Sequence, residues 1–496
     1  MYAPLLIGDD SLNLDSNKVY VSKIDDVYIK VNAEFGIRQE LTEYFTFMVP
    51  GAKFMPSYRN KMWDGKIRLY NNKNKQLYAG LVPYVDQFAK ERNYSVTFDD
   101  TVDKEEVFAQ NDASEWIGTL NLPLTPRGYQ VDAFIHAVRN NRAMLLSPTA
   151  SGKSLIIHLL LQWYGVKSLV IVPTTSLVLQ MQKDLISYGA NPDDIHIVMA
   201  GKEKDSDAPI VISTWQSIYN LNKKYFAQYE LCIGDEAHQF KAKSLTSIMT
   251  KLVNCKYRFG TTGTLDGMET HQLVLEGLFG KVKQVIKTKE LIDAKHLAEF
   301  KIKALVLKHP TQVCKDLRGK TYQEEIDYIV GSAERNKFIT NLTISLKGNT
   351  LLLFQFVEKH GKILHEMIEK EAGERKVFFI YGGTDAADRE EVRAIMEKES
   401  DAIIVASYGT FSTGINIINL SNIVFASPTK SKIRSLQSIG RGLRRSDTKH
   451  TATLLDIADD MSIGAHRNYT LKHFLERMKI YTKEKFKYRI HNIRLK

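Results

Sequence analysis

The residues from Ser147 to Ser154 have the types and order of a phosphate-binding loop, Ser-Pro-Thr-Ala-Ser-Gly-Lys-Ser. Such a loop holds phosphates through backbone N–H groups at the start of a helix, while its lysine reaches the β and γ oxygens and its last hydroxyl holds Mg²⁺. The residues expected at the nucleotide are Thr149, Ala150, Ser151, Gly152, Lys153 and Ser154. Ser147 replaces the usual first glycine, so the prediction depends on the Gly-Lys-Ser core and the apolar strand before it.

A second motif, Asp235-Glu-Ala-His238, directly follows the apolar segment 231–234. In open parallel sheets, ligands bind at the carboxyl ends of the strands, so both carboxylates should emerge at that edge. We expect Asp235 to hold Mg²⁺ and Glu236 to polarise the water that attacks the γ-phosphate. The same four residues could stand on an ordinary surface, but the phosphate loop upstream argues against that alternative.

The segment Gln437-Ser-Ile-Gly-Arg-Gly-Leu-Arg444 is typical of a helix, which would place Arg441 and Arg444 on one face. Two guanidinium groups there could stabilise charge on the transferring phosphoryl group, an effect worth roughly a thousandfold or more in rate. Alone, the arginines would indicate a solvated helix face. Together with the ATPase motifs, they favour a catalytic role for Gln437, Arg441 and Arg444.

In their order along the chain, these motifs resemble those of superfamily 2 DNA helicases of the DEAH-box type. The resemblance implies an ATP-dependent helicase that uses ATP and Mg²⁺. It assigns adenine recognition to Arg127 and Gln130, with a helix-start glutamine as the alternative, and it adds Gly414 to the nucleotide site. The residues that would couple hydrolysis to strand contact are His238, Thr262 and Thr264.

Several short hydroxyl-bearing segments resemble the strand-contacting motifs of the same superfamily, where such groups hold the phosphodiester backbone. Backbone contacts carry no sequence information, so tracking independent of sequence is expected. Each segment alone could equally be an ordinary turn or cap. The residues assigned to this role are Pro173, Thr174, Thr214, Gln216, Ser407, Ser412 and Thr413.

Within the superfamily, the chain most resembles the DNA repair and recombination helicases of T-even-type phages. The segments that carry this resemblance are 63–69, 319–326 and 406–414. It implies unwinding or remodelling of branched DNA, such as junctions, forks and RNA–DNA hybrids, and it allows phage recombination proteins as partners. Arg59 and Trp63 would contact nucleic acid, because cations hold phosphates and aromatic faces stack on bases. The alternative for Trp63 is a core anchor of the small N-terminal domain.

Two long regions alternate short apolar strands with helical patterns, which predicts an α/β fold with two RecA-like parallel-sheet lobes and a small N-terminal α+β domain. The expected parts are a nucleic-acid-binding domain at 1–115, an ATP-binding lobe at 116–285, a connection at 286–345, a second lobe at 346–460 and a basic tail at 461–496. The expected strands are 143–147, 168–173, 210–214 and 230–234 in the first lobe, and 351–356, 376–381, 401–406, 422–426 and 451–457 in the second.

The tail allows two interpretations. After Met461 the chain carries ten basic residues against Glu476 and Glu484, a net charge of +8, with aromatic residues between the cations. This composition suits a surface that binds a nucleic-acid strand. The same spacing also fits an amphipathic helix that docks on the second lobe.

The whole chain of 496 residues has a formal net charge of +11, which suits a polyanionic partner, nucleic acid or an acidic lipid surface. Its most apolar stretch, 155–172, is interrupted by polar residues, so no membrane span is expected. Asp9 and Asp10 follow a very short apolar run, unlike a secretory signal, and we expect a cytoplasmic protein in the host cell.

The three cysteines, Cys232, Cys255 and Cys314, have no paired spacing, so neither a disulfide framework nor a zinc site is expected. A monomer is expected because no coiled-coil heptad is evident. Two other functions remain open at this level. One is the motor subunit of a restriction enzyme, and the other is a nucleic-acid clamp or annealing protein that ATP only switches.

Overall fold

The computed structural model describes residues 17–49, 51–148, 150–199, 201, 203–239, 242–263, 265, 269–410, 419–428 and 451–495. Contacts divide the chain into two compact units, Met1–Leu146 with Lys153–Val285 and Ser147–Gly152 with Ile286–Lys496. Among the described residues, no helix is long and apolar enough to cross a membrane.

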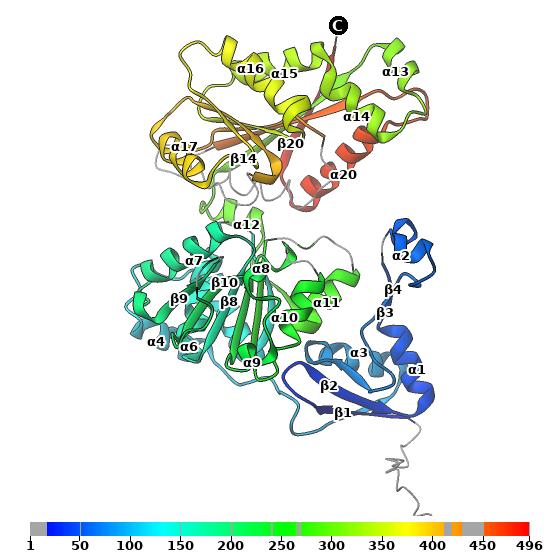
Figure 1. Ribbon diagram of the computed structural model, residues 1–496, viewed down its shortest axis with the longest axis vertical. Helices are drawn as coiled ribbons and strands as arrows, with labels where there is room; N and C mark the ends of the chain where they lie inside the picture. The colour runs from blue at the N-terminus through cyan, green and yellow to red at the C-terminus, as the bar shows by residue number, and fades with distance from the viewer. Residues whose placement is uncertain are drawn as a thin grey trace, which may run out of the picture. The chain divides into compact units, whose positions relative to one another are not determined.

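The first unit begins with a small domain built on a four-stranded sheet in the order β5-β2-β1-β6 (Figure 1). Its strands are β1 (Lys18–Lys23), β2 (Tyr28–Ala33), β5 (Gln76–Tyr78) and β6 (Ser95–Phe98), and its helices are α1 (Phe35–Tyr44) and α3 (Val82–Arg92). A second, two-stranded sheet forms an arm. The arm consists of β3 (Thr46–Met48), η1 (Ala52–Phe54), α2 (Pro56–Arg59) and β4 (Lys66–Arg68).

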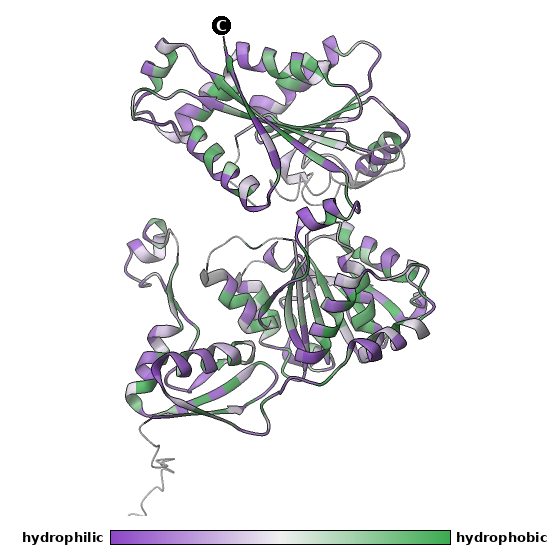
Figure 2. Ribbon diagram, turned by 180° about the vertical axis from the view of Figure 1, so that it is seen from behind, coloured by the Kyte–Doolittle hydropathy of each residue, from purple (hydrophilic) through white to green (hydrophobic). Residues whose placement is uncertain are grey.

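The rest of the first unit is a lobe around a seven-stranded sheet in the order β13-β7-β12-β11-β8-β10-β9, in which every pair is parallel. The strands are β7 (Arg142–Leu146), β8 (Ser168–Val172), β9 (Ile195–Val198), β10 (Ile210–Thr214), β11 (Leu231–Asp235), β12 (Tyr257–Thr262) and β13 (Val282–Gln284). The helices are α4 (Gln110–Thr119), α5 (Gly128–Asn140), α6 (Lys153–Tyr164), α7 (Thr175–Ser187), α8 (Trp215–Ile218), α9 (Lys223–Phe226), α10 (Ala242–Met249) and α11 (Glu269–Phe279). Figure 2 shows the central strands as mostly hydrophobic, as expected for a parallel sheet covered on both faces.

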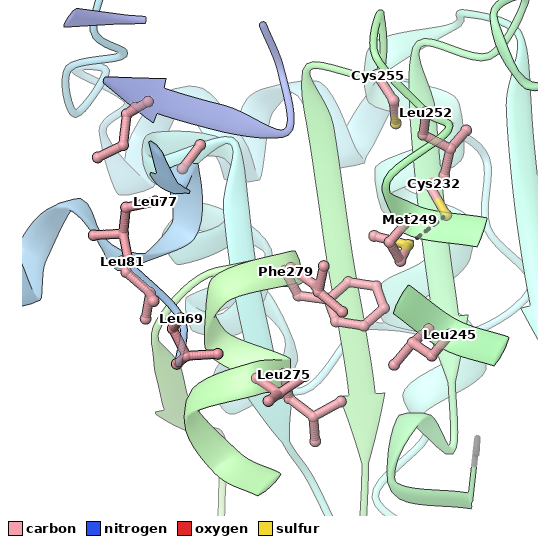
Figure 3. Packing of buried hydrophobic residues seen from close by; sticks show 14 of the residues in the cluster. Leu69, Leu77, Leu81, Cys232, Leu245, Met249, Leu252, Cys255, Leu275 and Phe279 are labelled. Carbon is pink, nitrogen blue, oxygen red and sulfur yellow. Dashed lines mark hydrogen bonds between the residues drawn. The ribbon is translucent and has the colours of Figure 1, made fainter. Parts of the chain in front are cut away.

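The small domain and this lobe share one hydrophobic core (Figure 3). Leu77 and Leu81 of the small domain belong to the same buried cluster as Leu275 and Phe279 of α11. Between them, the Tyr84 hydroxyl donates to Glu276 Oε2 at 2.5 Å. The small domain is therefore packed against the first lobe through α11.

The second unit is a lobe around another seven-stranded, all-parallel sheet, in the order β16-β17-β15-β18-β19-β14-β20. Its strands are β14 (Glu299–Lys308), β15 (Thr350–Phe354), β16 (Val377–Ile380), β17 (Ile403–Ser407), β18 (Asn422–Phe425), β19 (Thr451–Asp460) and β20 (Lys487–Arg494). Its helices are α12 (Thr288–Asp293), α13 (Thr311–Leu317), α14 (Tyr322–Gly331), α15 (Ala333–Ser345), α16 (Lys362–Glu371), α17 (Ala386–Lys398) and α20 (Tyr469–Lys483), with η5 (Val357–Gly361). The two parallel sheets and the small domain confirm the predicted fold class.

Two segments outside the expected second lobe contribute strands to its sheet. The expected connection, 286–345, supplies β14, and the expected tail, 461–496, supplies α20 and β20. The start of β14 alternates exposed charged residues with buried apolar ones, a pattern that a search for continuous apolar strands does not detect. Both segments are therefore structural parts of the second unit.

Candidate nucleotide site and strand-contacting residues

The phosphate-loop sequence connects β7 to α6, which begins at Lys153. Ala150 and Gly152 both have left-handed backbone conformations, with φ of 66° and 77°, so the chain turns sharply before the helix. The hydroxyls of Ser147 and Ser151 lie 2.6 Å apart, and Ser151 also donates to the carbonyl of Pro148 at 2.7 Å. Ser147 thus has a role in holding the loop that the glycine of the usual motif could not supply. Thr149 lies outside the described residues.

The lysine of the loop and the DEAH carboxylates come together within the first lobe. The Lys153 ammonium donates to Glu236 Oε1 at 2.7 Å, and both side chains are largely buried. Asp235 is the last residue of β11, and it accepts a hydrogen bond from the Thr261 hydroxyl on β12. Glu236 follows with a φ of 51°, which turns its side chain out of the strand direction.

The sheet order explains this proximity. β12 lies between β7 and β11, so Thr262 pairs with Leu146 at the end of β7, while Thr261 pairs with Asp235. All three strands are parallel, and their carboxyl ends meet at one edge of the sheet, where ligands bind in such folds. Thr261 was not among the residues predicted from the sequence, although it precedes the Thr-Gly-Thr motif and is the register partner of Asp235.

Burial and neighbouring charges shift the pKa values of the two carboxylates, Asp235 and Glu236, in opposite directions. Burial raises the pKa of Asp235, and the neighbouring Glu236 carboxylate adds to that effect. Burial alone would also raise the pKa of Glu236, but the charges of Lys153 and His238 and the hydrogen bonds from Lys153 and the Gly263 backbone together outweigh it and leave the pKa below its ordinary value. Glu236 is therefore held as an anion, which suits a group that orients water. A buried carboxylate such as Asp235 is stabilised by a cation, and its oxygens suit Mg²⁺.

His238 connects the DEAH motif to β12. Its Nδ1 lies 2.6 Å from the Thr262 hydroxyl oxygen and 3.4 Å from Glu236 Oε2, and its side chain is almost completely buried. The expected couplers His238 and Thr262 are thus in direct contact, and His238 also lies beside the carboxylate that would position water. Thr264 lies outside the described residues.

The expected metal ligand Ser154 has a partner that the sequence did not indicate. Its hydroxyl oxygen lies 3.0 Å from the Tyr188 hydroxyl, which belongs to the end of α7. Tyr188 is more than half buried, and burial raises its pKa, so the phenol stays protonated and can donate. Tyr188 therefore positions the Ser154 side chain at the start of α6.

The expected adenine-reading residues lie at the start of α5. Gln130 is almost completely buried, and its Oε1 accepts a hydrogen bond from the Arg127 backbone N–H at 2.8 Å. This contact makes Gln130 the third-position partner of a helix cap. The Arg127 guanidinium donates to the Tyr129 hydroxyl at 2.9 Å. Adenine recognition by Gln130 stays a prediction, since the capping contact uses the same amide oxygen.

The expected strand-contacting residues of the first lobe gather at the ends of two neighbouring strands. Pro173 and Thr174 follow β8, Thr214 ends β10, its neighbour in the sheet, and Gln216 follows in α8. The Gln216 amide donates to the Pro173 carbonyl at 3.2 Å, and the Thr174 hydroxyl accepts from the backbone at the start of α7. The two motifs are thus joined to each other at the carboxyl edge of the sheet.

In the second lobe, Ser407 ends β17, and its hydroxyl oxygen lies 2.7 Å from that of Thr410. The remaining residues assigned to this lobe lie outside the described part of the chain, and the structure does not place them. They are Ser412, Thr413, Gly414, Gln437, Arg441 and Arg444.

Arg59 and Trp63 both lie on the arm of the small domain, where they line a hollow of about 770 Å³. Lys53, Tyr58 and Lys61 line the same hollow. The Trp63 indole donates to the carbonyl of Lys66 at 2.9 Å, so it also holds the arm together. The structure therefore gives Trp63 a structural contact and leaves its part in nucleic-acid binding as a prediction.

Comparison with known protein families finds three matching models along the chain. The model described as DNA helicase UvsW, N-terminal matches residues 18–99, Type III restriction enzyme, res subunit matches 123–267, and Helicase conserved C-terminal domain matches 334–446. The first model covers the small domain, the second covers most of the first lobe and the third covers part of the second lobe.

Individual relatives agree with these matches. The ATP-dependent DNA helicase uvsW of Enterobacteria phage T4 is 35% identical over 498 residues, which cover 95% of this chain and 98% of the relative. The DNA 3'-5' translocase XPB2 of Sulfurisphaera tokodaii is 24% identical over 67% of this chain and 81% of its own length. The crystal structure of T4 UvsW matches with a TM-score of 0.52 and 34% identity over 97% of this chain and all of that chain. The phosphate loop, the DEAH contacts and this match over nearly the full length lead to one conclusion: the chain belongs to the UvsW family of superfamily 2 helicases.

Proposed function

We propose that this protein is an ATP-dependent DNA helicase or translocase that unwinds or remodels branched DNA in phage repair, recombination and replication, in the host cytoplasm. The observation that carries the proposal is the contact chain from Lys153 through Glu236 and His238 to Thr262. These contacts bring together, within one lobe, the lysine expected at the phosphates, the carboxylate expected to orient water and the pair expected to couple hydrolysis to strand contact. The relative that matches over nearly the full length carries the name of an ATP-dependent DNA helicase.

ATP would be held by the phosphate loop, with Lys153 on the β- and γ-phosphates. Mg²⁺ would be held by Ser154 and Asp235, because a hydroxyl and a buried carboxylate are hard oxygen ligands. When bound, the ion would neutralise charge on the transferring phosphoryl group. Glu236, kept anionic by its surroundings, would accept a hydrogen bond from the attacking water and orient it in line.

Gln437, Arg441 and Arg444 would complete the site from the second lobe, with the two guanidinium groups on the transferring phosphate. Closure of the lobes on ATP and their release after hydrolysis would shift the strand-contacting residues of one lobe relative to those of the other. In the first lobe, the strand-contacting residues would be those of the joined segments at Pro173 and Gln216. In the second, they would include Ser407.

The substrate follows from charge and from the family. A net charge of +11 favours a nucleic acid, and hydroxyls and backbone groups at the strand motifs suit phosphodiester contacts without base reading. Branched DNA, with RNA–DNA hybrids as a further substrate, is the finer assignment that the family supports. The restriction-enzyme model matches only residues 123–267, within the ATP-binding lobe, whereas the helicase relative matches nearly the whole chain. We therefore prefer the helicase to a restriction motor.

The test is ATP hydrolysis by the wild type and by Lys153→Ala, each with no nucleic acid, a single strand, a duplex and a four-way junction. The proposal expects stimulation by nucleic acid that disappears in Lys153→Ala, with the junction as the strongest stimulator. Hydrolysis that no nucleic acid changes would contradict the motor. Stimulation by single strands alone would retain the motor and contradict the preference for branched DNA.

A further inference from the structure

The C-terminal strand β20 is unusual for a parallel sheet because it is exposed along both faces. Residues 487–492 are all exposed, whereas every residue of β15, β17 and β18 in the same sheet is buried. Parallel strands are normally covered on both sides by helices. Tyr488 and Ile490 on one side of β20 are 38% and 52% exposed. The Tyr488 hydroxyl oxygen lies 3.4 Å from the Thr482 hydroxyl oxygen of α20, so this helix covers that side of the strand only in part.

The other side of β20 carries a group of cations that comes from two distant segments. In the register of β14 with β20, Lys301 pairs with Lys487 and Lys303 pairs with Arg489. Cross-strand partners project from the same face of a sheet, and residues two apart on one strand do so as well. All four side chains are exposed. We call Lys301, Lys303, Lys487 and Arg489 the cation face.

Little negative charge opposes these four groups. The two strands contain one carboxylate, Glu299, whose Oε2 lies 3.6 Å from Lys301 Nζ in an exposed pair of the kind that contributes little. Among the described residues, Lys303, Lys487 and Arg489 form no ion pair with a carboxylate. The cation face therefore has a net positive charge directed into solvent.

The cation face lies apart from the motor motifs of its own lobe. Its residues occupy the first half of β14 and of β20, toward the amino ends of these parallel strands. Ser407 lies at the carboxyl end of β17, at the opposite edge of the same sheet. The strand-contacting residue assigned to this lobe and the cation face therefore lie on two different surfaces.

We propose that the cation face binds the phosphate backbone of duplex DNA, such as an arm of a branched substrate. Two rows of cations, about 4.8 Å apart with a same-face repeat of roughly 6.6 Å along each strand, present a flat array of charges to a polyanion. Surfaces that grip single strands interleave aromatic rings with cations, but here the aromatic Tyr488 projects from the opposite face. The face also lacks the apolar centre of a protein interface.

This proposal also accounts for both interpretations of the basic tail. Helix α20 packs on β19 through the buried Arg477, which donates to Asp456 at 2.8 and 2.9 Å, and the Tyr481 hydroxyl donates to the same carboxylate. The helix therefore anchors the tail to the lobe. Strand β20, directly after it, carries the DNA-binding cations.

The experiment compares the full-length double variant Lys303→Glu/Arg489→Glu with the wild type for binding to a blunt duplex and to an oligothymidine strand of equal length. Fluorescence anisotropy without ATP is measured over a series of salt concentrations. The matched control is Lys370→Glu/Lys398→Glu, which reverses two exposed charges at the ends of α16 and α17. A neutral version, Lys303→Gln/Arg489→Gln, and thermal unfolding of all variants guard against misfolding.

We expect a tenfold or greater loss of duplex affinity in the double variant, with a change of less than about threefold for the single strand and for the control. Loss of two phosphate contacts should make the plot of log affinity against log salt shallower by about 1.8. Equal losses in the control would show only an effect of net charge and overturn the proposal, and so would equal losses on duplex and single strand. This inference rests on the proposed function, but the two can be contradicted independently, because DNA binding is measured here without ATP hydrolysis.

Discussion

The Lys153 ammonium and the Glu236 carboxylate are paired at 2.7 Å, although the mechanism assigns them to different partners. Lys153 must hold the phosphates of ATP, while Glu236 must orient water. The phosphates and Glu236 therefore compete for the same ammonium group. Binding of ATP would take Lys153 from the carboxylate and make Glu236 available for water only when a γ-phosphate is present. This exchange would suppress hydrolysis of anything but a correctly placed nucleotide.

Glu236→Gln should separate these two effects. Hydrolysis should fall at least a hundredfold, as expected for loss of a general base. ATP binding should become tighter by a few-fold, because the neutral amide competes less for Lys153. Binding of a fluorescent, non-hydrolysable ATP analogue and single-turnover hydrolysis measure the two quantities, with Lys153→Ala as the control that loses binding. Weaker nucleotide binding in Glu236→Gln would contradict the competition between the phosphates and the carboxylate.

Adenine recognition by Gln130 can be separated from its capping contact. The Oε1 atom accepts from the Arg127 N–H, and a glutamate would retain this acceptor while lacking the amide donor that adenine needs. Gln130→Glu should therefore keep the capping acceptor and lose most of the preference for ATP over GTP, although the burial of a carboxylate will lower the unfolding temperature. Site groups that hydrogen-bond a ligand discriminate strongly against one that cannot match them.

Gln130→Ala, which removes both the cap and the donor, should lose the nucleotide preference and also lower the unfolding temperature. Capping contacts of this kind contribute about 1 kcal/mol. The measurements are kcat/KM for ATP and GTP and thermal unfolding of both variants. A Gln130→Glu protein that still prefers ATP as strongly as the wild type would assign Gln130 to capping alone.

Loss of the contact between His238 and Thr262 should reduce DNA unwinding more than it reduces ATP hydrolysis. Thr262→Val keeps the shape of the side chain and removes the hydroxyl that lies 2.6 Å from His238 Nδ1. We expect hydrolysis to stay within about threefold of the wild type, while base pairs opened per ATP fall several-fold. Parallel assays of junction unwinding and phosphate release give that ratio. A proportional loss of both activities would place Thr262 in the hydrolysis step itself.

Some strands of the first lobe could be predicted from the sequence, and others could not. Continuous apolar strands such as β8, β10 and β11 were recognised, because a parallel strand covered on both faces leaves a short apolar run. Strand β12 was not predicted, since Arg258 interrupts its sequence. The structure buries that guanidinium completely, and it donates to the backbone carbonyls of Met249, Leu252 and Cys255. A buried cation of this kind has no signature in a hydrophobic pattern.

In the second lobe, the sequence could not predict the strand order for a different reason. Strand β14 lies between β19 and β20, each far from it in sequence, and nothing local in the chain indicates such neighbours. The sequence did identify the basic tail, but only the register of β14 with β20 brings Lys303 beside Arg489. In the same way, the packing of the small domain against α11 depends on a glycine whose importance no motif reveals.

That glycine, Gly80, allows a test of whether the small domain is fixed to the motor. A Cβ atom on Gly80 would lie 2.1 Å from the carbonyl oxygen of Glu276 and 2.8 Å from that of Gly277. Both are backbone atoms of α11, so the two parts must separate or shift to admit a methyl group. Gly80→Ala should therefore cost about 1–3 kcal/mol, the usual range for overpacking a well-packed contact.

The expected result is a lower first unfolding transition and faster protease cleavage in the exposed segment 103–107, between the small domain and the lobe. The matched control is Gly118→Ala in α4, where an added Cβ has no neighbour within 4 Å and should be neutral or slightly stabilising. Because α11 follows the Thr262 motif along the chain, loosening this contact should also reduce unwinding per ATP. Gly80→Ala could instead match the wild type in unfolding temperature, in protease resistance and in unwinding activity. That outcome would mean that neither the position nor the function of the small domain depends on this contact.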